Sequence, residues 1–170
     1  MNMSDFNPSN GLLLVCERDN AKRLFSARTD EGLTEFFEEY LRDANNLTPE
    51  RTLNLRSNWL SVHACFCGGK SDRDAGDLPL NQVILGGRQL GSGNGFQAVL
   101  VRPDFVPHIV TELSRFPKES ADNAFQIFQS SGSESSVEFS DVWALIGEIG
   151  RIFESAAQLQ AAVVFYHREN

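Results

Sequence analysis

A chain of 170 residues, 41% of them hydrophobic and 22% charged, has the composition of one soluble globular domain. It is long enough to bury a core without help from disulfides or a structural metal. The net charge of −8 argues against nucleic-acid binding, which needs clustered Lys and Arg, and no apolar run approaches the roughly 20 residues of a membrane span.

The N-terminal segment and the cysteine content favour the cytosol. The first ten residues are polar and carry no basic residue, and the apolar run Gly11 to Cys16 that follows is shorter than the roughly 7–15 residues of a signal-peptide core. The chain has 3 cysteines and no export signal, so reduced thiols and a cytoplasmic location are expected. We expect residues 1–10 to form a flexible tail and residues 11–170 to form a single domain.

The first third of the chain predicts one strand and two helices. The unbroken apolar run 11–16 is typical of a short strand buried on both faces, and residues 20–27 fit a short helix. Thr29 is placed to cap a clearer helix, with Asp30 and Glu31 in its first turn. The inner stripe of that helix is Leu33, Phe36, Phe37, Tyr40 and Leu41.

Acidic side chains gather on the outer face of this helix, at Glu35, Glu38 and Glu39 among others. A solvated helix face is the simplest explanation of such a run. The alternative is a docking surface for a basic protein partner.

Residues 58–69 predict a short core helix. Trp59, Val62, His63, Phe66 and Cys67 fall at helical spacing, and Gly68-Gly69 is a typical stop. We expect Trp59 to stack on His63, whose imidazole then bonds to a backbone carbonyl or a carboxylate.

The glycine-rich middle of the chain matches no cofactor motif. Thr48-Pro49-Glu50 predicts only a short turn before the core helix. The loop 70–77 lacks the glycine position and final Glu of a calcium loop. Gly86 to Gly95 lacks both the Lys-Ser/Thr of a P-loop and the spacing of a dinucleotide fingerprint, and is expected to be a mobile turn. We therefore predict no metal and no cofactor.

The second half predicts two strands, at 96–101 and 161–166, and three helices. Asp104 is expected to cap the first helix, residues 119–129 form the second, and Ser140 is expected to cap the third. Residues 130–136 are expected to be a flexible connector.

The Trp59-x-x-x-His63 pair ending in Gly68-Gly69, followed by Leu78-Pro-Leu-Asn-Gln-Val-Ile-Leu-Gly-Gly87, resembles the YfbM-like family of bacterial proteins. The similarity covers roughly residues 50–166. The resemblance implies a compact α+β domain. It supplies no catalytic residues, because the function of that family is unknown.

The sequence offers few candidate catalytic or metal-binding residues. His63, Cys65 and Cys67 would share a face for a metal only on a strand, and on a helix His63 and Cys67 are left as a pair typical of a core. His108 and His167 are expected to be solvated. Asp141 and Glu148, seven residues apart on the last helix, could face a cleft together, although exposed acids explain them more simply.

We therefore predict an α+β domain with a small mixed or antiparallel sheet packed by several helices. The preferred function is a small acidic cytosolic binding or interaction module, with Glu35, Glu38 and Glu39 as its candidate partner surface. The alternative is an enzyme or small-ligand-binding protein with a pocket near Trp59, His63 and Arg88. The sequence leaves the oligomeric state open.

Overall fold

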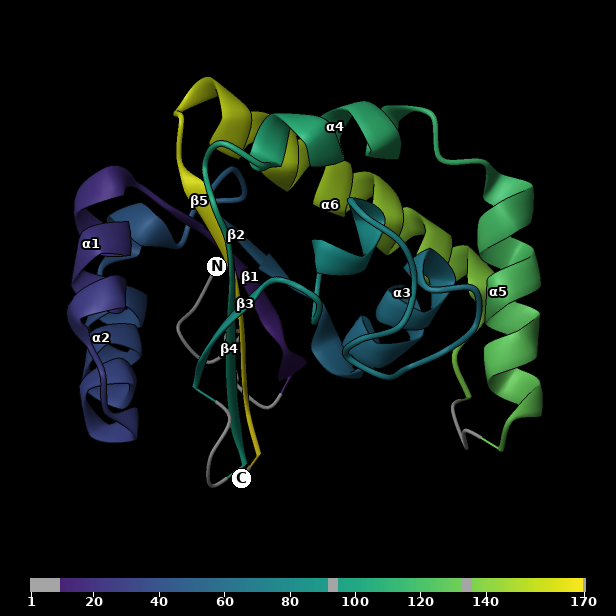
Figure 1. Cartoon of the computed structure of the whole chain (residues 1–170), viewed down its shortest axis with the longest axis horizontal. Helices are drawn as coiled ribbons and strands as arrows, with labels where there is room; N and C mark the ends of the chain where they lie inside the picture. Colours follow the sequence, from purple (N-terminus) through teal and green to yellow (C-terminus); the bar gives the residue numbers. More distant parts are fainter. Residues whose placement is uncertain (1–9, 92–94, 133–135, 170) are drawn as a thin grey trace.

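A five-stranded antiparallel sheet stands at the centre of the computed structural model, which describes residues 10–91, 95–132 and 136–169. Helices cover both of its faces (Figure 1). The strands lie in the order β2-β1-β5-β4-β3, so β2 and β3 are the two edges. Their bounds are β1 Leu12–Cys16, β2 Thr52–Asn54, β3 Arg88–Gly91, β4 Phe96–Val101 and β5 Ala162–Arg168. The predicted α+β class and the strands near 11–16, 96–101 and 161–166 are confirmed.

The three central strands are buried on both faces, which explains why their sequences are uninterrupted apolar runs. In β1, Leu13 and Val15 belong to the core on one side of the sheet. Leu12 and Leu14 belong to the core on the other side. A strand covered on both faces needs apolar residues at every position.

Helices α1 (Arg18–Ser26) and α2 (Asp30–Arg42) cover one face of the sheet (Figure 1). The predicted cap is confirmed, because the Thr29 hydroxyl accepts a hydrogen bond of 3.1 Å from the Gly32 N–H. Phe37 of α2 stacks on Tyr166 of β5, with ring centroids 4.0 Å apart. These contacts fix α2 against the sheet and leave its acidic face outside.

The other face carries α3 (Trp59–Phe66), α4 (Val106–Ser114), α5 (Lys118–Ser130) and α6 (Phe139–Gln158). The predicted core helix is α3, and Gly68 and Gly69 end it with φ values of 64° and 90°. Short 3₁₀ helices lie in the connections, at η3 Ala44–Asn46, η4 Arg56–Asn58 and η5 Leu80–Gln82. At 20 residues, α6 is longer than the other helices on this face of the sheet.

Some local predictions were wrong. Neither Asp104 nor Ser140 caps a helix, because α4 and α6 begin after Phe105 and Glu138, and neither N-terminus has a side-chain cap. The edge strands β2 and β3 were not predicted. The mobile turn predicted at 86–95 was wrong in part, because Arg88–Gly91 form β3. Residues 92–94 of that segment, 133–135 of the predicted connector 130–136 and 1–9 of the predicted tail lie outside the described part of the chain. Within the described residues, no helix has the length and apolar character needed to cross a membrane.

Candidate functional site

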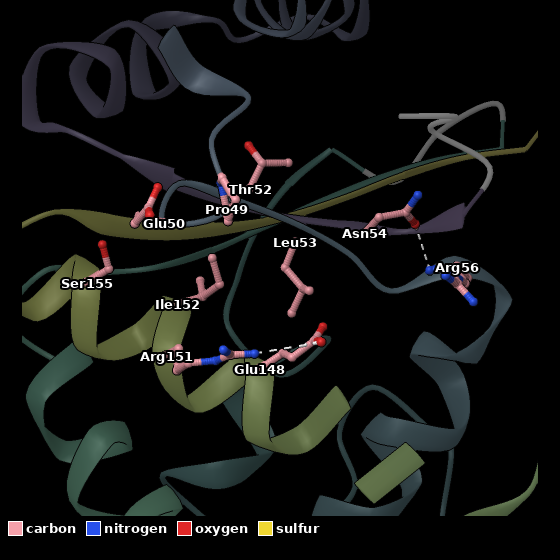
Figure 2. A pocket seen from close by; sticks show the side chains of 10 residues that line it. All are labelled: Pro49, Glu50, Thr52, Leu53, Asn54, Arg56, Glu148, Arg151, Ile152 and Ser155. Atoms are coloured by element: carbon pink, nitrogen blue, oxygen red, sulfur yellow. Dashed lines mark hydrogen bonds and ion pairs between the residues drawn. The ribbon is translucent and has the colours of Figure 1, made fainter. Parts of the chain in front are cut away.

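A groove of about 460 Å³ runs between the edge strand β2 and helix α6. Figure 2 shows Leu53 and Ile152 reaching toward each other from the two walls, with Glu148 and Arg151 beside them. The groove thus has an apolar floor and a charged rim. It is lined by Pro49, Glu50, Thr52, Leu53, Asn54, Arg56, Glu148, Arg151, Ile152 and Ser155.

The groove continues along α6 into a second hollow of about 280 Å³. The two hollows share Asn54, Arg56 and Glu148, and Asp141 lies toward the far end. The lining residues of α6 recur every three or four positions from Asp141 to Ser155, which makes one continuous stripe about 20 Å long at 1.5 Å per residue. Asp141 and Glu148 therefore do face a cleft together, as their spacing allowed.

Strand pairing positions the wall formed by β2. Val15 N–H donates to the Arg51 carbonyl at 2.7 Å, and Leu55 N–H donates to the Gly11 carbonyl at 2.9 Å. Neighbouring side chains of a strand point to opposite faces. Leu53 consequently faces α6, whereas the buried Thr52 donates its hydroxyl to the Asn46 carbonyl at 2.6 Å.

Arg56 stands where the two hollows meet, and its backbone is unusual. Its φ of 53° lies in the left-handed region, which costs a residue with a side chain free energy that glycine avoids. The Asn54 side chain holds the turn by accepting a hydrogen bond of 2.8 Å from the Arg56 N–H. The Arg56 guanidinium makes no ion pair with any described residue.

The remaining charges of the groove are loosely held. Arg151 approaches Glu148 at 3.7 Å, and the Arg151 side chain is largely open to solvent while that of Glu148 is 43% exposed. Exposed pairs of this kind contribute little stability, so a ligand can compete for either partner at small cost. No histidine or cysteine lines the groove, and the Thr52 hydroxyl is already bonded. The other hydroxyl of the lining, that of Ser155, makes no hydrogen bond to a basic side chain among the described residues. The site is suited to holding a ligand and lacks an evident nucleophile with a base.

His63 and Cys67 form a sealed pair elsewhere. His63 is 0% exposed, and its Nε2 lies 3.0 Å from the Asp72 carbonyl oxygen, which can only accept, so Nε2 carries the proton. The Cys67 sulfur lies 3.6 Å from Nε2 and 3.9 Å from Nδ1. The predicted bond from the imidazole to a backbone carbonyl is confirmed.

Burial keeps His63 and Cys67 in their neutral forms, which are unsuited to nucleophilic catalysis. Burial lowers the pKa of His63, although the bond to the Asp72 carbonyl opposes the shift. Burial, with a smaller contribution from the charge of Asp77, raises the pKa of the Cys67 thiol to about 11. A nucleophilic cysteine needs a thiolate beside a cationic or basic group. Here the thiol and the imidazole are both neutral, as in a packed core.

Trp59, His63 and Arg88 do not come together in one pocket. Trp59 packs on Phe165 at 5.3 Å, and not on His63 as expected, because it turns toward the sheet over Gly11. Arg88 lies on the opposite side of the sheet, with its guanidinium 4.7 Å from the centre of the Phe25 ring.

The two other histidines differ from each other. His167 is only 8% exposed and packs on Trp59 at 4.9 Å, so its predicted solvation was wrong. β5 continues past Tyr166, and this brings the ring of His167 under Trp59. His108 is exposed, as expected.

The candidate partner surface on α2 is exposed but partly neutralised. Glu39 pairs with Arg23 of α1 at 2.7 Å, and Glu38 approaches Arg42 at 3.5 Å and Arg168 at 3.9 Å. Glu35 is exposed and forms no ion pair with another described residue. A basic protein partner for Glu35, Glu38 and Glu39 stays a prediction, and cations of this chain already occupy part of that surface.

A further hollow of about 470 Å³ lies beside Leu78 and Pro79, near α4. Leu78 is 65% exposed at its rim, and Lys70, Asp77 and Glu112 contribute charges. Most of its lining comes from the connection between α3 and β3. Sites on regular elements hold ligand-binding groups more precisely than sites on loops, so the groove between β2 and α6 is the stronger candidate.

Comparison with known proteins identifies the family and adds no chemistry. The chain belongs to the family described as Domain of unknown function (DUF1877), whose model matches residues 10–166. The fold is similar to that of the crystal structure of YfbM, a protein of unknown function from Escherichia coli, with a TM-score of 0.69 and 10% sequence identity. That match covers 92% of this chain and 98% of the YfbM chain. The resemblance to the YfbM-like family is confirmed.

The comparison with curated proteins and the search for metal-ligand clusters in the described part of the chain both gave no match. No curated protein matches the chain. Among the residues that the structure describes, no group of three or more His, Cys, Asp or Glu side chains is arranged to hold a metal ion.

Proposed function

We propose that this protein is a binding module and that the groove between β2 and α6 is its ligand site. The observation that supports this most is the combination of an apolar floor, Leu53 and Ile152, with charges of both signs around it. Ligand sites typically combine apolar walls with a few polar groups in about 300–1,000 Å³, and this groove has about 460 Å³.

Binding is better supported than catalysis. The groove lacks histidine and cysteine, and the sealed His63 and Cys67 pair has the wrong protonation for a nucleophile. All three cysteines of the chain are free thiols, which supports the cytosolic location expected from the sequence. A binding module needs only a complementary surface, and the groove offers one on two regular elements.

A neutral probe tests the site without presupposing the charge of the ligand. Isotope-labelled protein titrated with millimolar N-acetyl-leucine amide should show NMR shift changes at the amides of Leu53, Arg56 and Ser155. Leu53→Ser should weaken this response, because it removes apolar area from the floor. Leu159→Ser changes an exposed leucine outside the groove and serves as the matched control. Shift changes confined to other surfaces would refute the proposal.

A further inference from the structure

We propose that the ligand of the groove is a small zwitterion, an amino acid or a short peptide, whose ammonium group pairs with Glu148 and whose carboxylate pairs with Arg56. The inference rests on the function proposed above and names the chemical class of its ligand. Its basis is the arrangement of charge in the groove.

Arg56 and Glu148 carry opposite charges and come from different elements, the connection after β2 and helix α6 (Figure 2). Both residues line both hollows. They do not form an ion pair with each other, although both line the same space. Among the residues that the structure describes, Glu148 has only the long contact to Arg151. A ligand that lies between the two walls can therefore meet a carboxylate on one side and a guanidinium on the other.

Charges of both signs line the groove, and this favours a ligand that carries both over a simple anion or cation. The larger hollow is lined by two carboxylates, Glu50 and Glu148, and by two guanidiniums, Arg56 and Arg151. A simple anion would face the carboxylates and the net charge of −8 of the chain, and a simple cation would face the guanidiniums. A ligand that carries both charges gains from both sets.

The apolar floor between the charged residues indicates the character of the uncharged part of the ligand. The half-buried Leu53 offers apolar contact to a side chain between the ammonium and carboxylate groups, with Ile152, only 2% exposed, at the base of the groove. The space of about 460 Å³, extended along α6 by about 280 Å³, has room for an amino acid or a peptide of a few residues.

Arg56 is the residue best placed to bind the carboxylate of the ligand. A guanidinium binds a carboxylate through two parallel hydrogen bonds, and that of Arg56 has no ion-pair partner among the described residues. Its left-handed backbone is held by Asn54 in a conformation that glycine would adopt more easily. Backbone strain of this kind often occurs at ligand sites.

The test compares the dipeptide Ala-Leu with two blocked forms by calorimetric titration. N-acetyl-Ala-Leu lacks the ammonium group, and Ala-Leu amide lacks the carboxylate. Each blocked form should bind about tenfold more weakly to the wild-type protein, the size expected for losing a hydrogen bond to a charged group. L-leucine is titrated in parallel, and the tighter of the two zwitterions indicates whether the source is an amino acid or a peptide.

Each of two variants should lose the preference for Ala-Leu over one of its blocked forms. Arg56→Asn keeps a residue that tolerates the left-handed backbone, and it should bind Ala-Leu no better than Ala-Leu amide. Glu148→Gln should bind Ala-Leu no better than N-acetyl-Ala-Leu. Arg18→Gln and Glu154→Gln remove exposed charges outside the groove and should keep both preferences.

Equal affinities for Ala-Leu and both blocked forms in the wild-type protein would overturn the inference. If N-acetyl-leucine amide still shifts the groove signals in that case, the site stands and only the zwitterion is wrong. If none of the probes, neutral or charged, affects the groove, the proposed function fails together with the inference.

Discussion

Replacing His63 by alanine is expected to lower the free energy of unfolding by about 1–3 kcal/mol, measured by urea denaturation at pH 7.5. The imidazole is fully buried, and its Nε2–H donates to the Asp72 carbonyl at 3.0 Å. The substitution leaves a cavity and a carbonyl without its donor. The matched control is His108→Ala, which removes an exposed imidazole and should change stability by less than about 0.5 kcal/mol.

The effect of His63 should also depend on pH. Because burial lowers its pKa below the ordinary 6.5, the unfolded chain binds a proton on this residue more readily than the folded one. Its contribution to stability is fully present above pH 6.5 and is lost as the pH falls from 6.5 through the lowered pKa. The stability difference between the wild type and His63→Ala should shrink over that range, and a difference that grows on acidification would contradict the buried, neutral imidazole.

Gly86→Ala is expected to destabilise the fold by about 2–3 kcal/mol. A Cβ at Gly86 would overlap the backbone carbonyl oxygen of Asn81, the same atom that accepts a hydrogen bond of 3.0 Å from the Gly86 N–H. Backbone cannot move aside as a flexible side chain can, so the turn after η5 must shift. The resulting strain should appear as a lower melting temperature.

Gly147→Ala is the control that should change stability in the opposite direction. Gly147 lies inside α6, and an added Cβ there meets no atom within 4 Å. Alanine in an open helical position should raise stability by about 0.5–1 kcal/mol. A similar loss of stability in both variants would contradict the packing described around Gly86.

The parts of the fold with strong local signals could be predicted from the sequence. The central strands 11–16, 96–101 and 161–166 are dense apolar runs, and Thr29 precedes an amphipathic helix. The edge strands could not be predicted in this way. β2 has only three residues, Thr52–Asn54, and is defined by pairing with the distant strand β1. β3 pairs with the neighbouring β4, but its four residues, Arg88–Gly91, include a single large apolar side chain and carry no strand pattern.

Only the α6 side of the candidate site could be predicted from a pattern in the sequence. Asp141 and Glu148 share a helix face because of their spacing, and that face lines the groove. The other wall, Leu53 and Arg56, comes from a segment about ninety residues earlier. No local pattern reveals that β2 lies at the sheet edge beside α6, or that Arg56 has a left-handed backbone. The pocket predicted near Trp59, His63 and Arg88 relied on sequence order, whereas the sheet separates Arg88 from the other two.

The site in the groove is tested most directly by intermolecular NOEs between Ala-Leu and methyl-labelled protein. We expect the leucine methyl groups of the peptide to contact the methyl groups of Leu53 and Ile152, which form the floor between β2 and α6. The Leu78 and Leu80 methyl groups in the hollow near α4 should show no such contact. NOEs to Leu78 and Leu80, or no intermolecular NOE to Leu53 and Ile152, would contradict a ligand site in the groove.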